Sequence, residues 1–270
     1  MAKNIINQWD PQFLQRSEIF ADLRILLEQQ EWNDWPGCSG LMALLDKTVL
    51  LGSGLPLKMV PQDDSLPHPQ MGYEERIFKT GLISTREHNW HDLFNACIWL
   101  LFPQTKIVLN ELHLTELAVQ TGNKRTSHRD IITHFDESGI VIASTDRSLM
   151  ELLKNHQWDK VFVHSRTLWW QQIGAFVFGH GLYEKAFNPF IGFTGKAYCI
   201  EVTEEFFQLD KMRQYQQLDR LLSDEIKNQQ MLFKHRALTP LPILGVPGWY
   251  EANKNPQFYH DKNYFREKRK

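Results

Sequence analysis

The chain has 270 residues, of which 42% are hydrophobic and 23% are charged. These fractions exclude a disordered, collagen-like or disulfide-stapled protein and describe a globular chain that can bury a large core. The formal net charge of −2 gives no strong nucleic-acid signal, because proteins that bind nucleic acids or anionic membranes generally carry a basic excess.

The cysteines and the apolar runs indicate a cytoplasmic protein without a membrane span. Cys38, Cys97 and Cys199 are widely spaced and form no CxxC pair, which disfavours a disulfide framework and a thiolate zinc site. The densest apolar run, residues 96–102, is far shorter than the roughly 20 residues that a membrane span needs. The first fifteen residues also lack the apolar stretch of a signal peptide.

The first third of the chain contains one predicted helix and a long irregular segment. Apolar residues at steps of three and four predict an amphipathic helix between residues 11 and 32. Residues 36–72 carry clusters of proline, glycine and serine around a strand-like stretch at 55–60. We therefore expect residues 36–72 to form a loop-rich connector or flap.

The middle of the chain reads mainly as helix. Helices are predicted over residues 89–102, 104–120 and 124–135, with stop signals at Pro103, Gly122 and Gly139. A strand at 140–143 precedes a helix at 147–156. Residues 160–164 favour a strand by propensity but fit equally a helix that continues to residue 178, because periodicity does not decide the type of a short apolar run.

A second strand is predicted at 196–202, before a long helix at 204–233. Residues 240–270 are rich in proline and aromatic residues, and we expect this tail to wrap a hydrophobic groove and close the core; a lid or partner-binding ribbon is the alternative. Neither a fixed-period repeat nor a low-complexity linker divides the sequence. The expected fold is a single α+β domain over residues 1–270, predominantly helical with a few short strands.

Several segments, spread in order over nearly the whole chain, carry a recognisable pattern of residues. They are Tyr73-Glu74, Gly81, Arg86, Asn89 to Asp92, Phe94-Asn95, Phe102-Pro103, Lys106, Asn110, His113, Arg129-Asp130, Phe135 to Glu137, Gly139, Phe178 to His180, Glu184-Lys185 and Leu241 to Trp249. Taken together, these segments resemble the bacterial family of unknown function called DUF3025. The resemblance implies no activity, since the name of the family records none.

Histidines provide the main functional signal. Five of the eleven histidines lie within the 47 residues from 88 to 134. Helical spacing places His91, Asp92 and Asn95 on one polar patch at the start of a predicted helix. A carboxylate beside an imidazole there can orient water or a metal ion. The alternative is structural: the acid stabilises the helix N-terminus and the histidine donates a hydrogen bond.

Two further helices carry polar stripes. Lys106, Asn110 and His113 are spaced by four and three residues, so they line either a cavity or a solvated helix face. The next stripe pairs Arg125 with Arg129 and Asp130 with His134 at i,i+4. Such an aspartate can hold an imidazole in the tautomer of a general base, while the arginines clamp a phosphate or carboxylate. Surface ion pairs use the same spacing.

The segment from 178 to 185 suggests a metal site. His180 and Glu184 lie one helical turn apart, which can place two ligands on one helix face, and the flanking glycines permit a close backbone approach. If His91, Asp92 or His113 joined this pair, three or four ligands with an open position would resemble a hydrolytic zinc, manganese or iron site. A divalent metal is therefore the one cofactor that the sequence suggests.

Several familiar catalytic motifs are incomplete or absent in this sequence. His128-Arg129-Asp130 copies part of the kinase catalytic loop, but Phe135 stands where the metal-binding asparagine is required. Residues 192–196 lack the first glycine and the hydroxyl residue of a phosphate-binding P-loop. The sequence also contains no HExxH zinc motif and no GxSxG nucleophile elbow.

We expect a hydrolase-like enzyme, metal-assisted or not, that acts on an anionic substrate. The expected catalytic residues are His91, Asp92, Asn95, Arg129, Asp130 and His134, the metal ligands His91, His180 and Glu184, and the substrate-binding residues Trp90, Lys106, His113 and Arg125. The alternatives are a noncatalytic protein that binds a small ligand, and an assembly factor that binds a protein partner through an exposed apolar patch around Trp249.

Overall fold

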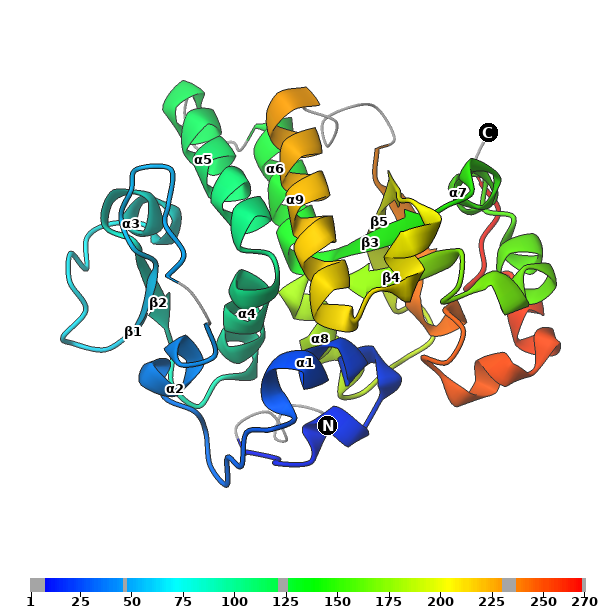
Figure 1. Ribbon diagram of the computed structural model, residues 1–270, viewed down its shortest axis with the longest axis horizontal. Helices are drawn as coiled ribbons and strands as arrows, with labels where there is room; N and C mark the ends of the chain where they lie inside the picture. Colours follow the sequence, from blue (N-terminus) through cyan, green and yellow to red (C-terminus); the bar gives the residue numbers. More distant parts are fainter. Residues whose placement is uncertain (1–7, 46–47, 121–125, 230–236, 269–270) are drawn as a thin grey trace.

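The structure is a computed structural model that describes residues 8–45, 48–120, 126–229 and 237–268. Its central element is a four-stranded sheet (Figure 1). Its order is β4-β3-β5-β6, from Ile173–Val177, Gly139–Ser144, Thr194–Glu201 and Thr239–Pro242. Strand β3 runs parallel to β5 and antiparallel to β4, and β6 runs antiparallel to β5. Every residue of β3 and β4 is buried, so both faces of these strands are covered.

A second, two-stranded sheet lies apart from the first, on the left of Figure 1. Strand β1 (Lys58–Pro61) pairs in parallel with β2 (Leu82–Thr85), and helix α3 (Tyr73–Thr80) connects them. Residues 36–72 also contain the short helix α2 (Cys38–Met42). This segment therefore contributes regular structure as well as loops.

Helices account for most of the fold. They are α1 (Arg24–Leu27), α4 (Trp90–Leu101), α5 (Pro103–Val119), α6 (Ser127–Ser138), α7 (Arg147–Lys154), α8 (His180–Ala186) and α9 (Lys211–Gln229), with α2 and α3 above. Helix α4 packs against α8, α5 against both α6 and α9, and α6 against α8 and the sheet. The predicted fold class, α+β and predominantly helical with a few short strands, is confirmed.

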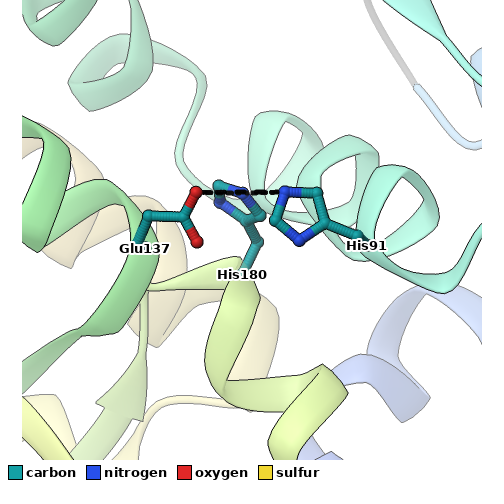
Figure 2. Close-up of side chains that lie close together, drawn as sticks. All are labelled: His91, Glu137 and His180. Atoms are coloured by element: carbon teal, nitrogen blue, oxygen red, sulfur yellow. Dashed lines mark hydrogen bonds and ion pairs between the residues drawn. The ribbon is translucent and has the colours of Figure 1, made fainter. Parts of the chain in front are cut away.

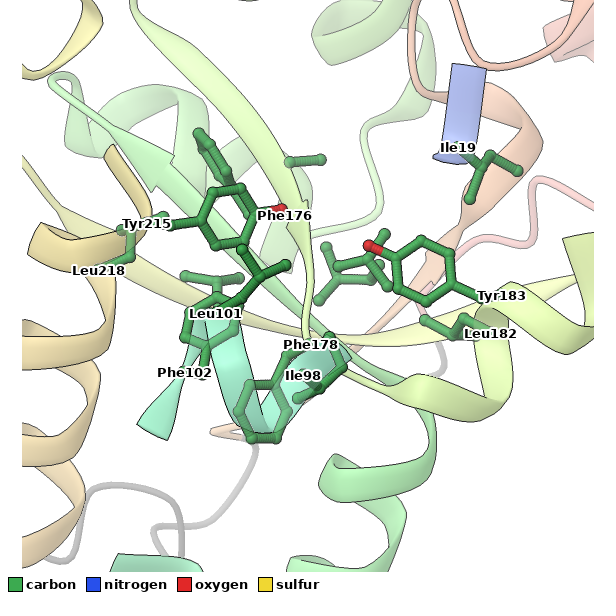
Figure 3. Close-up of a cluster of buried hydrophobic side chains, with 14 of the residues drawn as sticks. Ile19, Ile98, Leu101, Phe102, Phe176, Phe178, Leu182, Tyr183, Tyr215 and Leu218 are labelled. Carbon is green, nitrogen blue, oxygen red and sulfur yellow. The ribbon is translucent and has the colours of Figure 1, made fainter. Parts of the chain in front are cut away.

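An aromatic core joins α4, α6 and the β4–α8 segment, and Figure 3 shows Phe102 and Phe178 within it. The ring of Phe178 stacks on Phe135 at 4.7 Å and meets Phe102 edge to face at 5.2 Å. All three side chains are fully buried, and burial of one such side chain stabilises the fold by about 1.5–3 kcal/mol. The chain segments that follow Phe135 and Phe178 are thereby brought together.

The predicted helix over residues 11–32 is wrong as a single element. The structure has two 3₁₀ segments, Phe13–Gln15 and Glu18–Leu23, followed by the one-turn helix α1. Ser17 is extended, and its side chain accepts a hydrogen bond from the backbone N–H of Ile19. Because serine caps a new helical segment in this way, the apolar residues lie on separate short helical segments and not on one continuous helix.

The structure decides the open assignment at 160–178 and corrects the predicted helix at 204–233. Residues Lys160–His164 form a π-helical turn, but the helix does not continue to residue 178, because 173–177 form the buried strand β4. The predicted helix at 204–233 is split: residues 204–208 are 3₁₀, and α9 begins at Lys211 after Asp210 accepts a hydrogen bond from the Arg213 N–H. Residues 230–233 and 124–125 of the predicted helices lie outside the described residues.

The C-terminal tail adds strand β6 to the sheet and then packs as three 3₁₀ segments, at 243–245, 251–254 and 256–260. Trp249 is only 6% exposed, so the apolar patch that an assembly factor was expected to expose is buried at this residue. Within the described part of the chain, no helix combines the length and apolar character needed to cross a bilayer.

Candidate functional site

A polar cavity of about 340 Å³ lies where α3, α4, α5, α6 and α8 meet. All fourteen residues that line it carry a polar or charged group. Six of them are residues singled out from the sequence: His91, Asp92, Asn95, His113, Arg129 and His180. The cavity therefore joins several of the separate polar patches that the sequence predicted.

Three ligand-type side chains converge on one wall of the cavity (Figure 2). His91 comes from α4, Glu137 from α6 and His180 from α8. The Nε2 atoms of the two histidines are 3.1 Å apart, and Glu137 Oε1 lies 3.6 Å from His180 Nε2 and 3.9 Å from His91 Nε2. One ligand atom from each residue thus falls within a sphere of metal-site dimensions.

Glycines allow α6 and α8 to approach closely enough to bring Glu137 beside His180. A Cβ on Gly179 would lie 2.4 Å from backbone atoms of Ser138 and Gly139. A Cβ on Gly181 would lie 2.7 Å from Glu137 Oε2. Because backbone atoms cannot move aside for a Cβ this close, only glycine fits at position 179, and the close approach expected from the sequence is present.

The spacing of the three ligand atoms fits a divalent metal ion. In a triangle with sides of 3.1, 3.6 and 3.9 Å, the point equidistant from the corners lies about 2.1 Å from each, which is the usual zinc–nitrogen and zinc–oxygen distance. Two imidazole nitrogens and one carboxylate oxygen suit Zn²⁺, Mn²⁺ or Fe²⁺. Three protein ligands also leave a coordination position for water or substrate.

His91 is hydrogen bonded to a carboxylate, and a second carboxylate lies near His180. His91 Nδ1 lies 3.2 Å from Glu184 Oε2, and this hydrogen bond raises the pKa of His91 and lowers the pKa of Glu184. His180 Nδ1 lies 3.9 Å from Asp136 Oδ2. A carboxylate behind a ligating imidazole fixes its tautomer and makes it a stronger ligand. Glu184, predicted as a metal ligand, therefore lies behind His91, and Glu137 faces the candidate centre instead.

His180 is well suited to ligate a metal as a neutral imidazole. Its side chain is buried, and burial lowers its pKa to about 4. Among the described residues, its Nδ1 atom has no hydrogen-bond partner. If the two Nε2 atoms hydrogen bonded to each other, one would have to carry a proton, whereas a cation lets both present lone pairs.

A buried lysine organises the region behind His180. Lys106 Nζ donates to Asp136 and, at 3.1 Å, to Asn95 Oδ1, and it lies over the Trp99 ring. Asn95 in turn donates to the hydroxyl of Tyr73 at 2.7 Å. Lys106 was predicted to bind substrate, but it does not line the cavity and instead holds Asp136 in place.

Asp92 is engaged by an arginine. Its carboxylate accepts from the Arg86 backbone N–H at 2.7 Å and from both Nε and Nη2 of the Arg86 guanidinium. The Asp92 N–H donates to the side chain of Asn89, which caps α4. This geometry matches the structural alternative for Asp92, so we assign it no proton transfer.

Glu74 is a cavity residue to which sequence reasoning gave no chemical role. Its carboxylate accepts from Asn110 Nδ2, and burial raises its pKa to about 7. A carboxyl group that titrates near neutral pH can both accept and donate a proton during catalysis. Glu74, Asp136 and Glu137 appeared in the sequence only within the family pattern, because single acidic residues on helices give no signal of their own.

The remaining predicted residues lie elsewhere. Asp130 and His134 are exposed on α6 and do not line the cavity. Trp90 is buried against Trp9 and lines a separate, smaller cavity. Arg125 lies outside the described residues. The general base predicted at Asp130 and His134 and the aromatic substrate contact predicted at Trp90 therefore do not line this cavity.

The comparisons with known proteins place the chain in a family. The family model described as "Protein of unknown function (DUF3025)" matches residues 57–269, so the chain belongs to this family, as the resemblance indicated. Neither the curated proteins nor the solved structures contain a match to it. The match includes every residue named above in the cavity.

Proposed function

We propose that this member of the DUF3025 family is a metal-dependent hydrolase that acts on a small anionic substrate. The observation that carries the proposal is the convergence of His91, Glu137 and His180 on one wall of a polar cavity, at distances that suit one divalent ion. Three separate helices supply these side chains. Their proximity is therefore produced by the tertiary fold and not by the spacing of residues along one helix.

The proposed chemistry divides between the metal and the chain. A divalent metal, when bound, polarises a substrate carbonyl or phosphoryl group and makes a water molecule acidic. Glu184 holds the imidazole of His91 with Nε2 toward the centre, and the charge of Asp136 acts on His180 Nδ1 from 3.9 Å. Glu74, on the same cavity, carries protons to and from the reacting groups.

The anionic character of the substrate follows from Arg129. Its guanidinium donates to the neutral side chain of Gln120, and among the described residues it forms no ion pair with a carboxylate. Arg129 lines the cavity. Arg129 acts on Glu74 and Glu116 through its charge, but no carboxylate among the described residues forms an ion pair with it, and a guanidinium in this position beside a polar cavity favours binding of an anionic group.

Metal analysis tests the centre directly. The purified protein would be stripped with a chelator, dialysed against Zn²⁺ and analysed for bound metal, in parallel with His91→Gln, Glu137→Gln and His180→Gln. We expect about one zinc per chain in the wild type and an affinity lower by more than about 100-fold in each variant. His134→Gln, an exposed histidine on α6, is the matched control and should bind zinc normally.

Hydrolysis is tested on the same samples. The zinc-loaded protein would be assayed on N-acetyl amino acids, on their uncharged carboxamides and on p-nitrophenyl phosphate, and any turnover should disappear with the metal. A wild-type protein that binds well under one zinc per chain, or whose zinc content is unchanged in all three ligand variants, would overturn the metal centre. Zinc-independent turnover would overturn its role in hydrolysis.

A further inference from the structure

The size and lining of the cavity limit the substrate to a small polar molecule. A volume of about 340 Å³ lies near the lower end of the usual range for ligand pockets, about 300–1,000 Å³. Binding pockets are normally lined mostly by apolar side chains, but this one contains no aliphatic residue. A lipid, a long acyl chain or a large aromatic group would leave these polar groups without partners.

The charges around the cavity leave one cation for the substrate. Arg86 is neutralised by Asp92, with 2.7 Å between Nη2 and Oδ1. Lys106 is neutralised by Asp136. Among the described residues, Arg129 has a hydrogen bond to the neutral amide of Gln120 and no ion pair, and it acts on Glu74 and Glu116 only through its charge. A single guanidinium matches a single carboxylate, which it can bind through two parallel hydrogen bonds.

The donor set and the number of metal positions favour amide hydrolysis over phosphoryl transfer. Two histidines and one glutamate form the zinc set of several metallopeptidases. Phosphoryl transfer generally relies on oxygen-rich magnesium sites or on two metals about 3.5–4 Å apart. Among the described residues, only one cluster of three metal-ligating side chains is present, so one metal position is available.

We infer that the substrate is a small polar amide with a free carboxylate, such as an N-acyl amino acid or a dipeptide, whose carboxylate binds Arg129 while its amide bond lies at the centre formed by His91, Glu137 and His180. This inference rests on the proposed function and specifies its substrate class. It assigns Arg129 to substrate recognition and not to bond cleavage.

The reaction requires only water as a co-reactant. Water adds to the amide carbonyl carbon, and the proton that it loses passes to Glu74. The carbon–nitrogen bond then breaks and the amine nitrogen takes that proton, which gives a carboxylic acid and an amine. At neutral pH the acid gives up its own proton to the amine, so the products are a carboxylate and an ammonium ion. Glu74 is suited to this transfer because its pKa of about 7 leaves both protonation states populated at neutral pH.

Other charged groups near Glu74 influence its proton. Asp136 raises its pKa, while Lys106 and Arg129 lower it. The hydrogen bond from Asn110 also lowers it. A substrate carboxylate bound at Arg129 would offset the charge of that arginine and so raise the pKa of Glu74, which makes its carboxylate a stronger base for the proton of the attacking water.

The test compares free acids with their carboxamides. Zinc-loaded wild-type protein would be assayed on N-acetyl derivatives of the twenty amino acids, on dipeptides, and on the same compounds with the terminal carboxylate amidated. We expect kcat/KM to be about 100-fold higher for free acids, since a bidentate charged contact is lost in the amides. Arg129→Gln should raise KM for free acids by about 100-fold and change kcat far less, while KM for the carboxamides stays as in the wild type.

Controls separate recognition from folding. Zinc binding by Arg129→Gln should be unchanged, and Arg129→Lys should recover part of the affinity for free acids. Arg147→Gln, an exposed arginine on α7, should behave as wild type. Equal kcat/KM for acids and carboxamides would overturn the inference. Zinc-dependent turnover of p-nitrophenyl phosphate alone would also overturn it but leave the hydrolase proposal standing, whereas a zinc-loaded protein without turnover of any of these substrates would overturn both.

Discussion

Glu184 Oε2 lies 3.2 Å from Nδ1 of His91, the ring nitrogen that faces away from His180. His91 therefore presents Nε2 to the candidate metal centre, and Glu184 selects the tautomer that leaves this atom unprotonated. The two residues come from different helices, α4 and α8, which pack against each other. Glu184 acts on the metal through His91 and is a positioning residue.

Replacing Glu184 by glutamine tests this relationship. Glutamine keeps the shape but not the charge, so the imidazole becomes a weaker base and ligand. We expect zinc affinity to fall by about 10–100-fold, less than for His91→Gln. Equilibrium dialysis with Zn²⁺ measures both values, and Lys185→Gln, the neighbouring residue on α8, is the control. An unchanged affinity in Glu184→Gln would remove its role at the centre.

Gly179 sets the distance between α6 and α8. Because an added Cβ would meet three backbone atoms at 2.4 Å, Gly179→Ala must push the two helices apart. We expect a loss of about 3 kcal/mol or more in the free energy of unfolding, together with weaker zinc binding. Gly37→Ala provides the control, since nothing lies within 4 Å of its added Cβ. Urea unfolding of both variants in the metal-free state measures the difference, and equal stabilities would contradict the packing argument.

The buried pair of Lys106 and Asp136 should contribute strongly to stability. The side chains are 5% and 20% exposed. Lys106→Met leaves the Asp136 charge without its cation, which costs about 3–5 kcal/mol in the free energy of unfolding for buried pairs. Lys79→Met breaks the exposed pair with Glu75 and should cost less than about 1 kcal/mol. If Lys106→Met lost no more stability than Lys79→Met, the lysine would not be the support of Asp136.

Local signals explain which elements were predictable. Helices α4 and α5 match their predicted ranges closely because Asn89 caps the first and Pro103 starts the second, and both signals act on neighbouring backbone. Strand β4 could not be distinguished from a helix, since all five of its residues are buried and show no alternation. Helix α3 was not predicted, as it lies next to a segment dominated by turn residues.

The candidate site was only partly predictable, because some of its residues lack a local sequence signal. His91 and His180 were found because histidine is rare and they lay beside other polar residues at helical spacing. Glu137 and Glu74 were missed, since acidic residues are common on helices and only the tertiary packing brings these two to a cavity. Residue spacing along the chain could not show that Glu137 lies beside His180, because the approach of α6 to α8 depends on a close backbone contact at Gly179.

The last prediction concerns the pH dependence of stability. Burial raises the pKa of Glu74 to about 7 in the folded protein, whereas the unfolded chain has the ordinary value near 4.5. Below pH 4.5 Glu74 is protonated in both states and costs nothing. As the pH rises from 4.5 to 7, the unfolded chain loses the proton first, so the folded state becomes less stable by on the order of 2 kcal/mol after allowance for partial exposure.

Glu74→Gln removes this loss, because glutamine does not ionise and still accepts a hydrogen bond from Asn110. The variant should therefore gain on the order of 2 kcal/mol relative to wild type between pH 5 and pH 8, as measured by urea unfolding of metal-free protein at both values. Other titrating groups are common to the two proteins and cancel in the difference. Glu75→Gln is the control on the same helix: Lys79 lowers the pKa of Glu75, so its replacement should give no such gain. Parallel pH profiles for wild type and Glu74→Gln would show that Glu74 ionises normally, and its assignment as the proton carrier would fail with them.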